Sequence, residues 1–363
     1  MYQQIVSLAT LVLLVACGGG GGGGGASSVS AGGDPTPTAT SDWLIPENQI
    51  VDGGPGRDGI PAIDNPMFVQ IPIGQPIGLP ANLVVGYKSG GEVKAIPHDI
   101  LDWHEIVNDT LQGEPVVVNY CPLTGSAMLW RSSMSDPDPR FGVSGLVYNS
   151  NLILFDRQTG SHWSQMRVQS VQGPRRGEVP ERLPLVETTL GTWHAMYPDS
   201  FVMTRDTGFT RNYALYPYGS FRTSNGLFFN VEPRDLRLQE KTRVLGVRLN
   251  GVARAYVIDE FDAGIEVIND TLGGVPIVVA GSAGANIAVT FRSTLDDGIV
   301  LDFAAPADPL PTIMIDNEGN TWDVFGEALT GTRSTEKLAL ADSYIAYWFA
   351  WAAFNPGSEI AGQ

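Results

Sequence analysis

Short apolar runs, bounded by glycine, proline, asparagine and aspartate, dominate the chain from about residue 81 onward. Runs of this kind are typical of β-strands joined by tight turns. In the first half the pattern predicts strands at Leu83–Tyr87, Glu92–Ile96, Glu105–Asp109, Val116–Cys121, Ala127–Arg131, Gly142–Tyr148 and Asn151–Asp156. Helices are predicted at Thr189–Tyr197 and Asp342–Phe354, and the second is apolar on all sides, which indicates a buried helix.

The chain repeats part of its own pattern roughly 160 residues later, a period too long for a solenoid of small repeats. Asn108–Leu111 recurs as Asn269–Leu272, and Trp193 matches Trp351. We therefore predict a β-rich α+β protein of two tandem related lobes of short antiparallel strands, each ending in a helix. The predicted first repeat lobe is 43–203, and the second is 244–363.

The predicted connector between the lobes, residues 204–243, is rich in aromatic and charged residues, among them Tyr213, Tyr216 and Tyr218. Two interpretations account for these rings. They line a ligand cleft between the lobes, where pockets are common, or they belong to a loop that packs onto a core.

The N-terminal segment, residues 1–17, is predicted to be a lipoprotein signal peptide. Ile5 to Ala16 is an apolar run too short to span a bilayer. It ends in Leu14-Val15-Ala16-Cys17-Gly18, which resembles the lipobox of bacterial lipoproteins, although no Lys or Arg precedes Cys17. We expect Cys17 to carry the lipid once the residues before it are removed. Residues 18–42, made largely of Gly, Ser, Thr and Pro, would then tether the folded part to the membrane of an extracytoplasmic cell envelope.

The charge of the chain excludes one class of partner. The formal net charge is −17, with only 22 Lys and Arg residues. Nucleic-acid binding needs clustered cations that neutralise phosphates, so we expect no nucleic-acid partner. A small molecule or a protein remains open as the partner.

The strongest chemical hypothesis concerns His104 and Cys121. If Asp109 faces Val116 in a hairpin, His104 falls opposite Cys121, and directly opposed Cβ atoms lie about 4.5–5.5 Å apart. Cys121 is the only cysteine besides Cys17, and all four histidines also lie in the first half, so the predicted second lobe lacks these reactive groups. His98 is interpreted differently, as the start of a turn or short helix.

Three roles remain open for this pair. His104 could activate Cys121 as a nucleophile or redox thiol, or both could bind a metal such as copper or zinc. The third role is inert, because buried cysteines often pack as small hydrophobic residues.

The motifs together resemble a bacterial and archaeal family catalogued as domain of unknown function 3179. The resemblance covers most of residues 45 to 360 and rests on Asp58–Ile63, Trp103–Asp109, Tyr120–Leu123, Phe141–Gly145, Tyr148–Ser150, Phe155–Gly160, Trp163–Gln165 and Trp348–Trp351. It implies no established activity, but it favours His104, Cys121, Asp156 and Arg157 as site residues. Many members look like Cys-Pro-Leu-Cys where this chain has Thr124 in the last position, which argues against a two-cysteine site here.

Two functions follow from the sequence. The first is a cell-envelope enzyme or redox protein that uses Cys121 with His104, with or without a metal, and with Asp156 and Arg157 as further catalytic candidates. The alternative is a non-catalytic lipoprotein that binds a ligand or a partner and holds Cys121 in its core.

Overall fold

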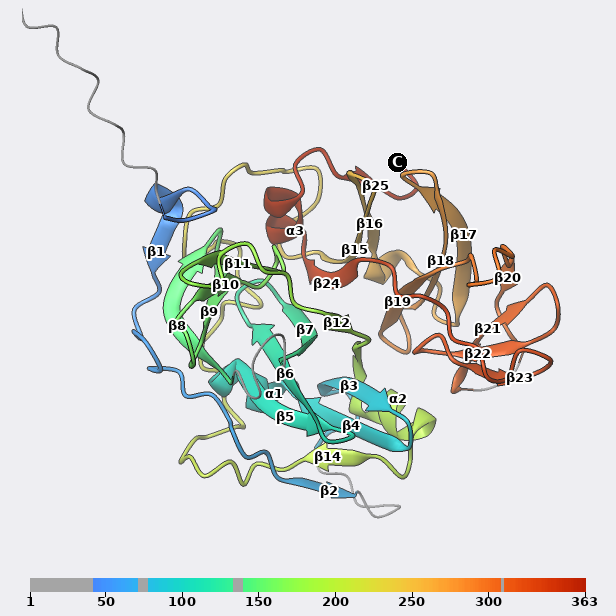
Figure 1. The fold of residues 1–363 in the computed structure, drawn as a ribbon, viewed down its shortest axis with the longest axis horizontal. Helices are drawn as coiled ribbons and strands as arrows, with labels where there is room; N and C mark the ends of the chain where they lie inside the picture. Colours follow the sequence, from blue (N-terminus) through green and yellow to red (C-terminus); the bar gives the residue numbers. More distant parts are fainter. Residues whose placement is uncertain (1–41, 71–77, 133–139, 308–309) are drawn as a thin grey trace, which may run out of the picture. The chain divides into compact units, whose positions relative to one another are not determined.

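The computed structural model describes residues 42–70, 78–132, 140–307 and 310–363 (Figure 1). The predicted signal peptide with Cys17 and nearly all of the predicted tether lie outside the described residues. The fold is β-rich α+β, as predicted, with mostly antiparallel sheets and a few short helices.

The first half of the described chain contains three sheets. Their strand orders are β13-β3-β4-β14-β2, β12-β7-β6-β5 and β1-β8-β9-β10-β11. The strands are β1 (Ile50–Asp52), β2 (Phe68–Gln70), β3 (Leu83–Ser89), β4 (Glu92–Pro97), β5 (Ile106–Leu111), β6 (Glu114–Cys121), β7 (Ser126–Arg131), β8 (Phe141–Tyr148), β9 (Asn151–Asp156), β10 (His162–Ser164), β11 (Gln169–Gln172), β12 (Arg182–Leu183), β13 (Val186–Thr189) and β14 (Phe201–Met203). The helices are η1 (Glu47–Gln49), α1 (His98–His104) and α2 (Leu190–Met196).

The second half has three sheets of corresponding order, β24-β15-β16-β25, β17-β18-β19 and β20-β21-β22-β23. The strands are β15 (Arg243–Leu249), β16 (Val252–Val257), β17 (Glu266–Leu272), β18 (Val275–Ser282), β19 (Ile287–Arg292), β20 (Phe303–Ala304), β21 (Thr312–Asp316), β22 (Thr321–Asp323), β23 (Ala328–Thr330), β24 (Ser343–Tyr347) and β25 (Glu359–Ile360). The helices are η2 (Ile258–Glu260) and α3 (Trp348–Phe354).

Details of packing also correspond between the halves. Gly86 lies under Trp193 so closely that a Cβ would come within 2.0 Å of the ring, and Gly246 lies under Trp351 in the same way, at 2.2 Å. Each indole N–H donates to the hydroxyl of a serine seven residues further on. A tandem duplication remains a prediction that these parallels favour. The halves share hydrophobic clusters, so they are not separate bodies.

The strand predictions hold well, and one helix prediction is partly wrong. All seven strands predicted in the first half are present, with ends shifted by at most a few residues. The helix predicted over Asp342–Phe354 begins only at Trp348, because Ser343–Tyr347 forms β24 and pairs with β15. Every residue of β24 is buried. A strand buried on both faces shows no alternation, so its pattern cannot be distinguished from that of a buried helix.

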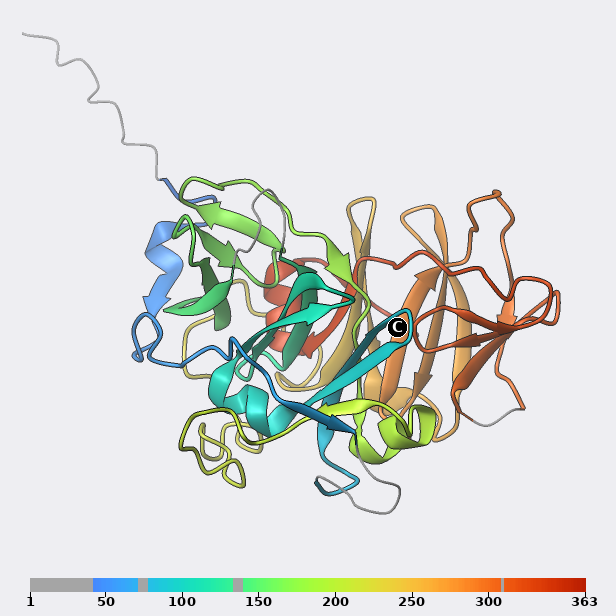
Figure 2. The same cartoon turned by 60° about the horizontal axis from the view of Figure 1, so that its bottom comes forward.

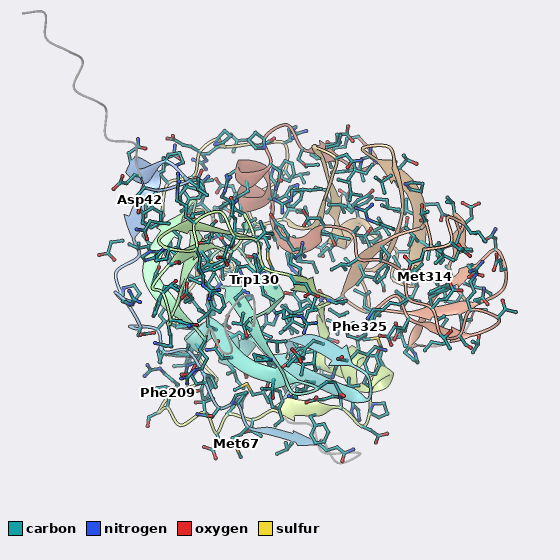
Figure 3. All side chains as sticks on the ribbon, in the orientation of Figure 1. Asp42, Met67, Trp130, Phe209, Met314 and Phe325 are labelled. Atoms are coloured by element: carbon teal, nitrogen blue, oxygen red, sulfur yellow. The ribbon has the colours of Figure 1, made fainter. Side chains whose placement is uncertain are left out.

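The core is rich in tryptophan. Trp130, fully buried, lies inside the first half with its ring edge-on to Phe141, at 6.1 Å between centroids (Figure 3).

Within the described ranges, no helix is long and apolar enough to cross a membrane.

The predicted connector runs as irregular chain between β14 and β15, without a helix or strand over residues 204–242. Figure 2 shows its first part, coloured yellow-green, passing close to α1. The indole of Trp103 donates to the carbonyl of Leu215 at 3.0 Å, which ties the connector to the helix. Side chains of the connector therefore meet those of the first half.

Candidate functional site

The hairpin of β5 and β6 has the predicted register, with Asp109 opposite Val116. Gln112 and Gly113 form its two-residue turn, and both have positive φ, as a type I′ hairpin turn requires. The strand begins later than predicted, however, at Ile106. His104 therefore belongs to α1, and the predicted cross-strand position opposite Cys121 is wrong.

The end of α1 explains this difference. Glu105 follows the helix with φ 57°, in the left-handed region that stops many helices. This residue redirects the chain before β5 begins, so the alternation of strand faces does not extend back to His104. Such a conformation is uncommon for a glutamate, and the residues around it give no signal for it.

His104 is fully buried. Its Nδ1 lies 2.8 Å from the carbonyl oxygen of Pro61, and its Nε2 lies 2.7 Å from the hydroxyl of Tyr213. Because a carbonyl only accepts, Nδ1 carries the proton and Nε2 accepts from Tyr213. Burial lowers the pKa of His104, so the neutral ring is favoured. Both ring nitrogens are occupied by partners other than Cys121.

Cys121 ends β6 and is 2% exposed. Its Sγ lies 3.7 Å from the carbonyl oxygen of Ser150. Burial, assisted by the negative charge of Glu105, raises the pKa of the thiol to about 11. A thiol with that pKa stays protonated at neutral pH, whereas nucleophilic cysteines have lowered pKa values.

Thr124, where the resemblance implied a second cysteine in many relatives, places a hydroxyl near Cys121. Thr124 Oγ1 lies 2.8 Å from Ser126 Oγ and accepts a hydrogen bond from Asn151 at 3.0 Å. Thr124 is fully buried in this network. Its side chain therefore has a packing role beside the single thiol.

Asp156 and Arg157 stabilise loops. The buried carboxylate of Asp156 accepts from the indole of Trp163 at 3.0 Å and from the backbone N–H of Thr159 at 2.6 Å. Arg157 makes a bidentate ion pair with Asp58 near the surface. Its Nη2 donates to Oδ1 at 2.9 Å, and its Nη1 donates to Oδ2 at 3.0 Å. Neither residue has a described contact with His104 or Cys121.

The proposed metal site has little geometric basis. In residues 42–70, 78–132, 140–307 and 310–363, no group of three or more His, Cys, Asp or Glu side chains is arranged to hold a metal ion. His104 and Cys121 do not converge either, because each has the separate partners described above. The chain's own donors thus do not assemble a copper or zinc site at these two residues.

A polar cluster that the sequence did not reveal lies between α1 and the connector. Asp102 Oδ1 accepts from Arg222 at 2.5 Å, and Arg222 also donates to the hydroxyl of Tyr120 at 3.0 Å. Next to them, the carboxylate of Glu105 accepts from the hydroxyl of Tyr218 at 2.5 Å. Burial raises the pKa of Asp102 to about 6 and that of Glu105 to about 7.

His98 begins α1, as predicted, and extends this cluster. Its Nε2 lies 3.3 Å from the carboxylate of Glu187, and its ring stacks at a tilt on Tyr120 at 4.8 Å between centroids. Glu187 also pairs with Arg243. Burial alone would raise the pKa of Glu187, but the positive charge of Arg243 and the contact with His98 lower it to about 2.

A pocket of about 620 Å³, partly open to solvent, opens onto this cluster. We call it the α1 pocket. Its polar and aromatic lining residues are Asn82, His98, Asp99, Asp102, Arg205, Tyr213, Tyr216 and Arg222. Three of its buried polar atoms, His98 Nε2, Asp99 Oδ1 and Tyr216 Oη, have no hydrogen-bond partner among the described residues. Of these, His98 Nε2 has the ion-pair contact with Glu187, so Asp99 Oδ1 and Tyr216 Oη are left without a partner. Tyrosines of the connector thus line a pocket, although it lies against α1 and not between two lobes.

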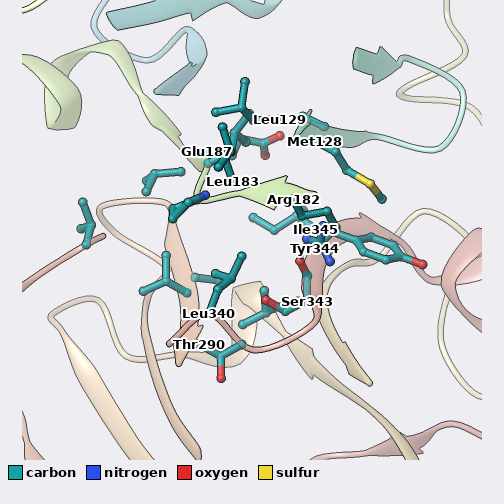
Figure 4. A pocket seen from close by; sticks show the side chains of 18 of the residues that line it. Met128, Leu129, Arg182, Leu183, Glu187, Thr290, Leu340, Ser343, Tyr344 and Ile345 are labelled. Atoms are coloured by element: carbon teal, nitrogen blue, oxygen red, sulfur yellow. Dashed lines mark hydrogen bonds between the residues drawn. The ribbon is translucent and has the colours of Figure 1, made fainter. Parts of the chain in front are cut away.

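A second cavity, shown in Figure 4, is too small for an organic ligand. Strands β7, β12, β13, β15, β19 and β24 enclose about 50 Å³ there. That space suits one or a few water molecules, since one water needs about 10–15 Å³ on this measure. The α1 pocket is therefore the better candidate for a ligand site.

A family model described as "Protein of unknown function (DUF3179)" matches residues 57–358 of the chain. No curated protein and no solved structure matches the chain. The family match spans both halves, the connector and every residue of the α1 pocket.

Proposed function

Since the chain belongs to the DUF3179 family, whose description names no activity, we propose from its own geometry that it is a ligand-binding lipoprotein of the cell envelope. The proposed ligand is a small, uncharged, hydroxyl-rich molecule held in the α1 pocket. The observation that carries this proposal is the pair of buried polar atoms, Asp99 Oδ1 and Tyr216 Oη, without partners in that pocket.

Unpaired buried polar atoms favour a ligand that completes them. A buried donor or acceptor without a hydrogen bond costs about 1–3 kcal/mol, and most native groups of this kind have partners. Asp99 Oδ1 offers an acceptor, and Tyr216 Oη offers both a donor and an acceptor. A hydroxyl group can satisfy either atom, because it both donates and accepts.

The ion pairs in the lining favour an uncharged ligand. Arg222 pairs with Asp102, and Arg205 pairs with Asp99. Each charge thus has its counterion within the wall, so a charged ligand would have to compete with an existing pair. The rings of Tyr213 and Tyr216 add flat apolar surface, which suits the faces of a sugar ring.

Thiol or metal catalysis by Cys121 and His104 remains a prediction with less support. The thiol is buried and its pKa is raised, and the imidazole hydrogen-bonds to Pro61 and Tyr213. These features agree with the alternative of a binding protein that holds Cys121 in its core.

The proposed location rests on the sequence alone. The apolar run before Cys17 and the glycine-rich segment after it favour a lipid-anchored protein outside the cytoplasm. A binding pocket at the end of such a tether would face the extracytoplasmic space.

Calorimetric titration of the full chain with glucose, trehalose and N-acetylglucosamine tests the proposed binding. We expect at least one sugar to bind, and we expect Tyr216→Phe, which removes only the unpaired hydroxyl, to weaken it about tenfold. Tyr148→Phe is the matched control, because Tyr148 lies outside the α1 pocket. Absence of binding by all three sugars, or equal affinity in both variants, would contradict the proposal.

A further inference from the structure

A second open pocket, of about 470 Å³, is lined by four arginines from separate parts of the chain. Arg167 follows β10, Arg182 belongs to β12, Arg248 to β15, and Arg292 ends β19. We call this site the arginine pocket. Its other lining residues are Val168, Gln169, Val179, Pro180, Leu340, Ala341 and Asp342.

The charge of the arginine pocket is opposite to that of the whole chain. The chain carries a net charge of −17 and only 22 basic residues, yet four of these line one pocket. Asp342 is the only carboxylate among the lining residues. It is shared, since Arg182 Nη1 lies 2.5 Å from its Oδ1 and Arg248 Nη2 lies 3.1 Å from its Oδ2.

The two remaining guanidinium groups have no counterion in the part of the chain that the structure describes. Among the described residues, the side chains of Arg167 and Arg292 make no ion pair or hydrogen bond within the protein. A single carboxylate thus faces four cations, which leaves the pocket with an excess of positive charge. This excess favours an anionic ligand with more than one negative charge.

Part of this positive charge is also poorly hydrated. The side chain of Arg182 is 16% exposed, and Figure 4 shows it beside Ser343 and Tyr344. Burial lowers the pKa of Arg182, and the positive charge of Arg248 acts in the same direction. Removing a charge from water is costly, and Arg182 must share its counterion Asp342 with Arg248, so a second anion would stabilise this arrangement.

We propose that the arginine pocket binds a small phosphate-class oxyanion, either a free anion or the phosphate of a lipid headgroup. Guanidinium groups match the oxygens of phosphate with two parallel N–H···O bonds, and four arginines line this one pocket. The volume of the arginine pocket, about 470 Å³, lies in the range of small-ligand sites. The arginine pocket is separate from the α1 pocket, because the two pockets share no lining residue.

Calorimetry on the full chain, purified in a non-ionic detergent and a phosphate-free buffer, tests this site. Pyrophosphate serves as the free anion, and glycerophosphoglycerol serves as a soluble lipid-headgroup analogue. We expect Arg167→Gln and Arg292→Gln each to weaken binding roughly tenfold, since each removes charge-assisted hydrogen bonds. Neither side chain has a described partner whose loss would unfold the protein.

Arg176→Gln is the matched control, because Arg176 is exposed and lies outside the arginine pocket. Tighter binding of pyrophosphate identifies a free anion as the ligand class, and tighter binding of glycerophosphoglycerol identifies a lipid headgroup. Either result supports the site if the control binds like the wild type. No binding of either probe at millimolar concentration, or equal weakening in all three variants, overturns the proposal.

Discussion

Glu105 shows how a single residue combines backbone geometry with electrostatics. Its positive φ ends α1 before β5 begins, and the residue is 5% exposed. The carboxylate accepts from Tyr218 but has no described cation as counterion. Burial therefore raises its pKa to about 7, from an ordinary value of 4.5.

This raised pKa predicts a pH-dependent stability. Below the ordinary pKa the carboxyl is neutral in both the folded and the unfolded chain, so it causes no penalty. As the pH rises toward 7, the unfolded chain ionises first, and the folded state loses stability. Glu105→Gln keeps the acceptor for Tyr218 and removes this loss. We expect the variant to gain roughly 2–3 kcal/mol over wild type at about pH 8 and almost nothing at about pH 4.

Urea unfolding at the two pH values measures this gain. Glu260→Gln is the control, because Glu260 is exposed and should show no gain at either pH. An equal effect of Glu105→Gln at both pH values would mean that the buried carboxylate does not titrate as described.

At the scale of elements, the turns after β9 and β21 are stabilised in the same way. Asp156 accepts from the indole of Trp163, and Asp316 accepts from the indole of Trp322 at 2.9 Å. Asp316 lies in the half that lacks histidine and cysteine. Because Asp316 makes the same contact in a half without these reactive groups, we infer that both aspartates stabilise their turns independently of any functional site.

We therefore expect Asp156→Ala and Asp316→Ala to destabilise the chain by similar amounts, about 2–4 kcal/mol each, because each leaves buried donors unpaired. Chemical denaturation of both variants measures the loss in free energy of unfolding. The fraction of Asp156→Ala that remains folded and soluble should bind sugar like the wild type. A stable Asp156→Ala variant that no longer binds ligand would instead place Asp156 in the functional site.

The elements also show which structural features could be predicted from the sequence. The register of β5 and β6 was predictable, because alternation and a two-residue turn are local. The position of His104 was not, because it depends on one left-handed residue, Glu105. The β24 strand was missed for a related reason, since burial on both faces removes the alternation by which a strand is recognised.

At the scale of the whole molecule, the α1 pocket depends on contacts that no local pattern encodes. Asp102 and Arg222 are 120 residues apart in the sequence, and their ion pair forms because the connector passes against α1. The aromatic residues of the connector did suggest a cleft. Only the tertiary fold brings together the other residues that line the α1 pocket. The same holds for the four arginines of the arginine pocket.

We infer that Cys121 belongs to the core, and we propose the neighbouring α1 pocket as the functional site. The most direct measurement is the rate at which iodoacetamide alkylates Cys121 in the folded full chain at neutral pH, followed by mass spectrometry, with the urea-unfolded chain as reference. We predict that the folded chain reacts at least about a hundredfold more slowly, because the thiol is 2% exposed and its pKa is raised to about 11. Alkylation of the folded chain as fast as that of the unfolded chain, and slower alkylation in His104→Ala, would show instead that Cys121 is a reactive thiol activated by His104.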